Sequence, residues 1–395
     1  MTHESQFFLD HLGQTSPFPF LIEVDRAEGA YIFDKQGKAY LDMIAGVAVN
    51  NIGHRHPKVI AALKTQLDKH LHVMVYGEFI QDAQQQLVRE LLTVLPVNLN
   101  GVYVVNSGTE AIEAALKLAK RVTGRTELVA FKGSYHGSTH GAMSVSANEV
   151  KKIAFRPLLP DVRFLPHNEI AVLEQITTRT AGVIIETIQG DAGVRRPSAA
   201  FMHALRARCT AVGALLIFDE IQCGMGRAGT MFAFEQFDVV PDILTLGKAL
   251  GGGMPIGALV SAQQHLKTFT HAPMLGHITT FGGHPMVCAA AAATVQVLRT
   301  EIDWSLLEQR AAAFAAQITA HPAVQNHRRV GAMFAFDLSS AEAVEKVVQY
   351  CLEQGLITFW FLSHPYSFRL SPPLNLAQKD WDLAAKVIIS ALDRL

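Results

Sequence analysis

Short apolar strands alternate with helices over the middle of this chain, and this alternation limits the possible folds more than any other feature. From about residue 100 onward the pattern predicts strands at 101–105, 127–131, 182–186 and 214–218, and helices at 110–122 and 199–212. The strands are continuous apolar runs, as in parallel sheets that are buried on both faces. We therefore expect an α/β fold with a mostly parallel sheet covered by helices.

The two ends of the chain have a different pattern. Residues 20–45 alternate like a small antiparallel sheet, with strands at Ala30–Phe33 and Ala39–Leu41. After about residue 290 the pattern changes to helices, at Trp304–His321 and Ala341–Gln354, around short strands. This change predicts a domain boundary near residue 290.

Composition argues against several kinds of partner and location. A formal net charge of −1 over 395 residues provides no basic field, so we expect neither nucleic acid nor a membrane as a partner. The amino end lacks the phases of a signal peptide, and the most apolar later stretch, 287–298, is too short to span a bilayer. Four widely separated cysteines without a Cys-x-x-Cys pair predict reduced thiols and a cytoplasmic location.

Two residues near predicted strand ends carry groups suited to a buried chemical site. Asp219 follows Leu216–Ile217–Phe218, and a carboxylate in such a low dielectric needs a charged or strong hydrogen-bond partner. Lys248 has apolar neighbours, which argue against a fully exposed amine. An acid that holds a ring nitrogen protonated and an amine that forms an imine are what pyridoxal phosphate chemistry requires. In the alternative interpretation, Asp219 is only a salt-bridge partner and Lys248 is an exposed surface lysine.

The segment Ser107–Gly108–Thr109–Glu110 follows a strand and begins a helix. Free N–H groups, a glycine that permits close approach and two hydroxyl groups are suited to a phosphate. Ser107 and Glu110 also match a capping box, which would mean only a well-capped helix. The segment lacks the lysine of the phosphate-binding loop of nucleotide hydrolases, so it is not that motif. Phosphate binding and helix capping both remain possible roles for it.

Further polar residues lie in loops at the ends of predicted elements. Tyr135 and His136 follow a strand in a glycine-flanked loop, where a ring can stack on a flat cofactor or belong to the core. Glu186 ends an apolar strand, and Thr280 precedes an apolar helix that its hydroxyl could cap. The histidines lack the local spacing of a metal site, so we expect no metal.

In this order, these segments resemble those of the class III aminotransferases, which are pyridoxal-phosphate enzymes of fold type I, and within them the acetylornithine/ornithine branch. The resemblance extends from Asp34–Gly37 to Arg369–Leu374 and is most specific between Phe218 and Pro255. It implies a large cofactor-binding domain at 56–290. It also implies a smaller α+β domain built from both chain ends, 1–55 and 291–395.

The resemblance implies roles for the matching residues. Lys248 would bind the cofactor as a Schiff base and move the substrate proton, and Asp219 would keep the ring nitrogen protonated. Thr280 would reach the phosphate site of a second subunit, which makes the active unit a homodimer. The other implied cofactor contacts are Ser107, Gly108, Thr109, Tyr135, His136, Glu186, Ile221 and Gln222.

Substrate contacts are implied for Arg369, as the residue that binds the substrate carboxylate, and for Tyr76. The chain departs from the family pattern at two such sites. Ser138 occupies the place of an arginine that grips a second carboxylate, and a serine cannot reproduce that bidentate contact. Asp191 occupies the place of a glutamate that, in ornithine-type enzymes, pairs with the equivalent of Arg369. These departures leave the amino donor and the keto-acid acceptor open.

The function that we expect is therefore a transaminase that moves an amino group from an amino acid or ω-amine to a keto acid. An aminomutase or racemase of the same fold is the alternative, and it would need no keto-acid acceptor. A non-catalytic binding or assembly protein is an alternative of another class. The presence of both Lys248 and Asp219 argues against it.

Overall fold

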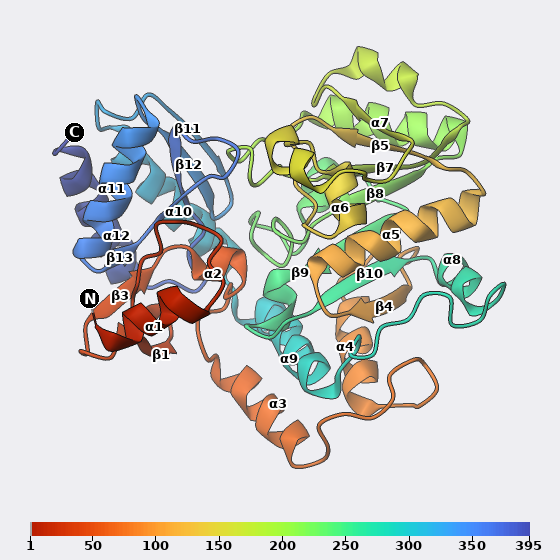
Figure 1. Ribbon diagram of the computed structural model, residues 1–395, viewed down its shortest axis with the longest axis horizontal. Coiled ribbons are helices and arrows are strands. Elements are labelled where there is room, and N and C mark those ends of the chain that lie inside the picture. Colours follow the sequence, from red (N-terminus) through yellow and green to blue (C-terminus); the bar gives the residue numbers. More distant parts are fainter. Residues whose placement is uncertain (1) are drawn as a thin grey trace.

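A seven-stranded sheet forms the centre of the larger domain in the computed structural model, which describes residues 2–395 (Figure 1). Its strands lie in the order β4 (Gly101–Val105), β10 (Gly257–Ser261), β9 (Ile243–Gly247), β8 (Leu215–Asp219), β7 (Thr180–Glu186), β5 (Glu127–Phe131) and β6 (Val162–Leu165). The five strands β9, β8, β7, β5 and β6 are parallel to one another. Strand β10 is antiparallel to both of its neighbours, β4 and β9. The predicted mostly parallel sheet is confirmed.

Both faces of this sheet are covered, which explains why its strands are apolar throughout. On β8, Leu216 and Phe218 belong to the core that contains Phe201 of α7 (Ala199–Val212). Ile217, between them, belongs to the core that contains Ile112 of α5 (Gly108–Thr123). Because successive strand residues point to opposite faces, α5 and α7 cover opposite sides of the sheet.

Capping residues delimit these two helices. Ser198 Oγ accepts a hydrogen bond from Phe201 N–H (3.2 Å) at the start of α7. Gly124 and Gly213 end α5 and α7, each with a φ of +68°, which is a left-handed conformation that glycine adopts without steric cost. The predicted helices at 110–122 and 199–212 are thus confirmed within two residues at each end.

The remaining helices cover the edges of the sheet and the smaller domain. They are α1 (His3–His11), α2 (Ala45–Ala48), α3 (Pro57–Leu67), α4 (Asp82–Leu92), α6 (His140–Val145), α8 (Gln263–Leu266), α9 (Pro285–Glu301), α10 (Trp304–Thr319), α11 (Ala341–Glu353) and α12 (Gln378–Leu392). The apolar α9 packs against α3 and α4, as Figure 1 also shows. Within residues 2–395, no helix is long and apolar enough to cross a membrane.

Both chain ends build the smaller domain, in which the two termini lie (Figure 1). Its two sheets have the orders β1 (Val24–Glu28), β2 (Tyr31–Asp34), β3 (Ala39–Asp42), β13 (Leu356–Ile357), and β11 (Asn326–Val330), β12 (Met333–Asp337), β15 (Ser367–Leu370), β14 (Phe359–Trp360). β13 pairs in parallel with β3, so Leu356 lies beside Leu41. The predicted α+β domain of both ends is confirmed, whereas its boundaries at residues 55 and 290 stay a prediction.

Candidate active site

The carboxyl ends of four parallel strands and of β4 meet at one edge of the large sheet, and a cavity of about 250 Å³ opens there. Its walls come from loops after β5, β7, β8 and β9 and from the first turn of α5. The lining residues are Gly108, Thr109, Tyr135, His136, Gly137, Ser138, Glu186, Ile188, Asp219, Ile221, Gln222, Cys223 and Lys248. Most of the residues named from the sequence are therefore in one place, because parallel strands bring their carboxyl ends to the same edge.

Asp219 ends β8 and is buried, with 4% of its surface exposed. Each of its carboxylate oxygens has a donor. Oδ1 accepts from Ile221 N–H (3.0 Å), and Oδ2 accepts from His136 Nδ1–H (2.7 Å). The other ring nitrogen of His136, Nε2, is buried without a hydrogen-bond partner among the described residues. These two contacts hold the carboxylate in one orientation at the cavity wall.

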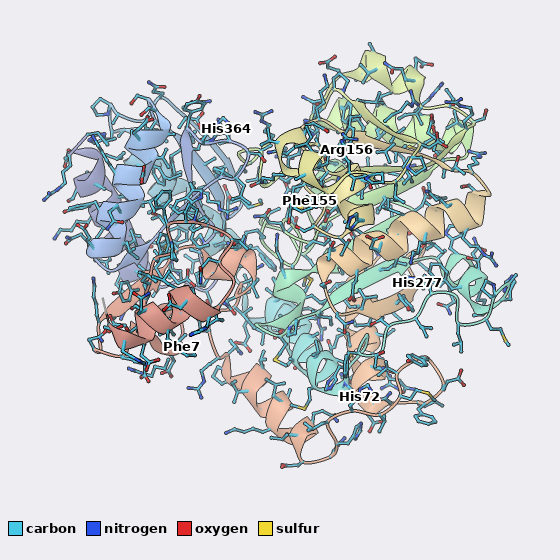
Figure 2. All side chains as sticks on the ribbon, viewed as in Figure 1. Phe7, His72, Phe155, Arg156, His277 and His364 are labelled. Atoms are coloured by element: carbon cyan, nitrogen blue, oxygen red, sulfur yellow. The ribbon has the colours of Figure 1, made fainter. Side chains whose placement is uncertain are left out.

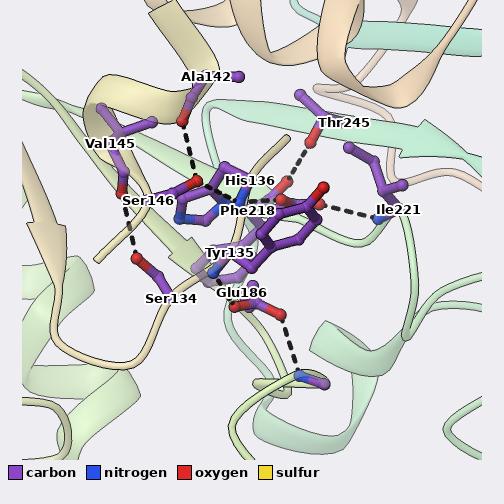
Figure 3. A network of polar contacts seen from close by, with 12 residues as sticks. Ser134, Tyr135, His136, Ala142, Val145, Ser146, Glu186, Phe218, Ile221 and Thr245 are labelled. Atoms are coloured by element: carbon purple, nitrogen blue, oxygen red, sulfur yellow. Dashed lines mark hydrogen bonds and ion pairs between the residues drawn. The ribbon is translucent and has the colours of Figure 1, made fainter. Parts of the chain in front are cut away.

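A chain of hydrogen bonds holds His136 in turn (Figure 3). Its backbone N–H donates to Ser146 Oγ (2.9 Å), and that hydroxyl donates to the carbonyl of Ala142 (3.0 Å) in α6. Ser134 Oγ donates to the Val145 carbonyl at 3.1 Å. The loop that carries the ring is therefore tied to α6 at two points.

Glu186 ends β7 beside Asp219, with which it pairs across the two strands. Its carboxylate accepts from Tyr135 N–H (2.9 Å) and from Gly190 N–H (3.0 Å), as drawn in Figure 3. Burial raises the pKa of Glu186 to about 7, and the nearby Asp219 charge contributes in the same direction. Glu186 thus links the loops after β5 and β7 at the cavity floor.

Lys248 follows β9, begins the 3-10 helix η5 (Lys248–Gly251) and lines the same cavity. Its backbone has a φ of +42°, in the left-handed region that a lysine rarely adopts. Strain of this kind is concentrated at functional sites. Burial lowers the pKa of the Lys248 amine, although the Asp219 charge opposes that shift. The lowered pKa favours the neutral form of the Lys248 amine, which is the nucleophilic form.

Glycines permit close packing around the start of α5, which lines the cavity. A Cβ at Gly108 would lie 2.7 Å from Ile221 Cγ2, and a Cβ at Gly137, where φ is +131°, would lie 2.4 Å from Thr109 Oγ1. Ser107 is the N-cap, since its Oγ accepts from Glu110 N–H at 3.3 Å. Capping is therefore confirmed, but the Glu110 side chain accepts from the N–H of Asn106 rather than of Ser107 (2.7 Å).

Arg369, in β15 of the smaller domain, lies outside this cavity but beside it. It lines a small adjoining cavity together with Gln222, which also lines the cavity that contains Lys248. Its guanidinium carbon lies 5.3 Å from the ring centroid of Phe359 and 5.7 Å from that of Phe361. Among the described residues it has no ion-pair partner, and its Nε has no acceptor. Burial lowers the pKa of this group, so a bound anion would stabilise it.

Asp191 does not form the ion pair with Arg369 that the family pattern implies. It binds the loop between β14 and β15 instead: Oδ1 accepts from Leu362 N–H (3.1 Å) and Oδ2 from Ser363 Oγ (2.6 Å). Lys151 Nζ lies 3.5 Å from Oδ2. The Asp191 carboxylate is therefore occupied by donors of this smaller-domain loop and by Lys151 instead of by Arg369.

Tyr76 and Thr280 lie apart from the Lys248 cavity of their own chain. Tyr76 lines a separate cavity of about 510 Å³ together with Thr279 and Gly283, and Thr280 itself is exposed. Ser138 is at the Lys248 cavity, where its Oγ lies 3.1 Å from the Tyr135 hydroxyl. Of the two residues outside the Lys248 cavity, Tyr76 therefore lines the second cavity and Thr280 lines neither.

Two groups at the site were missed by sequence reasoning. Lys151 and Ser363 contact Asp191, but neither stands in a motif, and no local signal identifies them.

Cys223 lines the cavity, but it is buried and its pKa is raised well above that of an ordinary thiol, mainly by desolvation. A thiol of that kind is unreactive, so Cys223 is not a candidate nucleophile.

Comparison with known proteins agrees with this geometry. The model of the class III aminotransferase family matches residues 13–392. The acetylornithine aminotransferase of Methanopyrus kandleri is 41% identical over 292 residues, which are 74% of this chain and 73% of that protein. That of Archaeoglobus fulgidus is 35% identical over 373 residues, 93% and 95% of the two chains. The ornithine aminotransferase of Toxoplasma gondii ME49 superposes with a TM-score of 0.91 at 27% identity, covering 100% of this chain and 96% of that one.

The chain therefore belongs to the class III aminotransferases. It is an aminotransferase, and pyridoxal phosphate is the cofactor of this class.

Proposed function

We propose that this enzyme transfers the amino group of an ornithine-like or N-acetylornithine-like amino acid to a keto acid. One observation carries the proposal: Asp219 and Lys248 lie on the walls of one cavity, and Arg369, which has no ion pair among the described residues, lies next to it. Similarity to acetylornithine aminotransferases over nearly the full chain supports the choice of donor.

Pyridoxal phosphate fits the residues of this cavity. Gly108 and Thr109, in the first turn of α5, line the cavity, so this turn offers N–H groups and a hydroxyl to a phosphate. Asp219 offers a buried carboxylate to a protonated ring nitrogen, and Lys248 offers an amine to the aldehyde. When bound, the cofactor supplies an electron sink for the negative charge that develops at the substrate Cα.

The chain's own groups then have distinct tasks. Asp219, oriented by His136 and the Ile221 amide, keeps the proton on the ring nitrogen. Lys248 Nζ would take the proton from the substrate Cα and pass it to the cofactor carbon that carried the aldehyde, for which its lowered pKa is suited. Tyr135 and Ile221 line the cavity and would pack on the two faces of the cofactor ring, and Gln222 is the contact that we propose for the ring oxygen.

Arg369 binds the substrate carboxylate in this proposal. Its planar guanidinium is desolvated and lacks an acidic partner within the described residues, so a bidentate carboxylate would supply the missing charge. Gln222 lines both cavities and thus lies between the carboxylate site and the reacting centre.

We further propose a homodimer in which Thr280 reaches the phosphate site of the second subunit. The exposed Thr280 side chain and the exposed apolar neighbours Ile278 and Phe281 support a contact there. Tyr76 lines the cavity beside this loop and would belong to the same contact. For location we propose the cytoplasm, because all four cysteines are free and buried.

A screen of half-reactions tests the proposed function. The holoenzyme is mixed with single amines and amino acids, and the loss of the cofactor's visible absorbance is followed without a keto acid. We expect the fastest loss with N-acetylornithine or ornithine, and recovery when a keto acid is added. Turnover of an amino acid to an isomer without any acceptor would instead indicate the aminomutase or racemase alternative.

A further inference from the structure

Lys151 is a cation at the edge of the active site to which the mechanism above gives no task. It ends the 3-10 helix η1 (Glu149–Lys151), and its Nζ lies 5.8 Å from the ring centroid of Tyr135. Tyr135 lines the Lys248 cavity, where its hydroxyl meets Ser138 Oγ at 3.1 Å. The ammonium therefore lies over the ring of a cavity-lining residue, although Lys151 is not itself among the lining residues.

A buried acid, Asp191, holds this ammonium in place and shares its oxygens with neutral donors. Asp191 is 5% exposed, and each of its oxygens already accepts a hydrogen bond from the loop that contains Leu362 and Ser363. Asn148 donates to Ser363 Oγ at 3.2 Å, so the segment that carries Lys151 is tied to the same loop. Figure 2 shows this region, where Phe155 lies on the large-domain side and His364 on the small-domain side.

Lys151 keeps donors available for another anion. Its side chain is 35% exposed, and its contact with Asp191 is a loose one at 3.5 Å. An ammonium donates up to three hydrogen bonds, so it can bind a second carboxylate while it stays beside Asp191. Among the described residues that line the cavity, Lys248 is the one lysine or arginine, and the mechanism engages it elsewhere.

We propose that Lys151 binds the distal anionic group of the substrate, and so makes the enzyme prefer dicarboxylate keto acids to monocarboxylate ones. The two substrate carboxylates would then be bound by different cations, Arg369 on the Gln222 side and Lys151 on the Tyr135 side. This inference rests on the proposed function, since it concerns the acceptor of the same reaction.

The test compares a dicarboxylate acceptor, 2-oxoglutarate, with a monocarboxylate acceptor, pyruvate, and uses the same amino donor for both. For Lys151→Met we expect the KM for the dicarboxylate acceptor to rise about tenfold, as for a lost hydrogen bond to a charged group. The KM for pyruvate should change less than twofold, because pyruvate has no second carboxylate. Lys151→Arg should restore most of the affinity for the dicarboxylate. Lys132→Met is the matched control, since Lys132 is exposed and has no ion pair among the described residues.

A binding measurement separates recognition from turnover. By titration calorimetry on the holoenzyme, Lys151→Met should weaken glutarate about tenfold and leave propionate unchanged. Equal loss for both acceptors would overturn the inference, because it would indicate a structural role for Lys151. So would a wild-type enzyme that uses pyruvate as well as it uses the dicarboxylate. An enzyme that aminates neither keto acid with any donor would overturn the proposed function itself, and the inference with it.

Discussion

Asp219 ends β8, Lys248 follows the adjacent parallel strand β9, and both line the same cavity, although they are far apart along the chain. Asp219 pairs with Thr245 across β8 and β9, and Lys248 follows three residues later, at the end of β9. The acid is held by His136 and the Ile221 amide, whereas the amine lies at a strained backbone position. An oriented carboxylate and an amine of lowered pKa are therefore presented to one ligand.

Lys248→Ala should abolish turnover, with a loss of at least about 10³-fold in kcat, because no other amine lines the cavity among the described residues. The variant should also lose the imine absorbance at about 400–430 nm that the cofactor gives with a lysine. Steady-state kinetics and absorbance spectra measure both effects. Lys132→Ala, on the same edge of the sheet but exposed, should behave like the wild type. Full activity in Lys248→Ala would disprove the assignment.

Asp219→Asn should lower kcat by about 10²- to 10⁴-fold while the fold is kept, since the amide has nearly the same size but no charge to hold a ring proton. The Asn oxygen can still accept from Ile221 N–H or from His136, so we expect a small change in Tm. Kinetics and thermal unfolding of the same preparation distinguish the two effects. A variant with normal kcat would show that the ring nitrogen does not depend on this carboxylate.

Arg369→Gln should raise the KM for every keto acid, monocarboxylate and dicarboxylate alike, by about 100-fold, as for the loss of a bidentate contact. This differs from the expected effect of Lys151→Met, which acts on the dicarboxylate alone. Because Arg369 is buried and has no acid within ion-pair distance among the described residues, the variant should be no less stable than the wild type. A KM that stays within twofold for both acceptors would place the carboxylate site elsewhere.

Glu186 should make stability depend on pH. Its pKa is about 7 in the folded protein against 4.5 for an ordinary glutamate, so the folded state binds more protons between these values. The contribution of Glu186 to the free energy of unfolding is fully present below about pH 4.5. It decreases by about 3 kcal/mol in total as the pH rises to about 7. The free energy of unfolding should thus depend on pH with a different slope in the wild type and in Glu186→Gln over this range. The variant should become more stable relative to the wild type as the pH rises.

Urea unfolding of the cofactor-free forms at pH 5, 6, 7 and 8 measures that difference. Glu220, whose pKa burial raises to about 8, is present in both proteins and cancels in the comparison. A constant offset between the two curves would mean that Glu186 does not change its protonation on folding.

The local elements could be predicted from the sequence because their causes lie within a few residues. Ser198 and Gly213 cap α7, and apolar runs such as Leu216–Phe218 form strands buried on both faces. The same patterns placed Asp219 and Lys248 near strand ends, and hence at one edge of a parallel sheet. What a side chain contacts across the fold has no such local cause.

The sequence by itself therefore determined the α/β architecture, the cofactor chemistry and most of the cavity wall. Only the tertiary structure decided that β10 runs antiparallel within the sheet, that β13 pairs with β3, and that Asp191 binds Ser363 instead of Arg369. It also brought Lys151 to the Tyr135 side of the site. These contacts join segments far apart in the chain, and they depend on how whole elements pack, whereas periodicity and capping depend only on near neighbours.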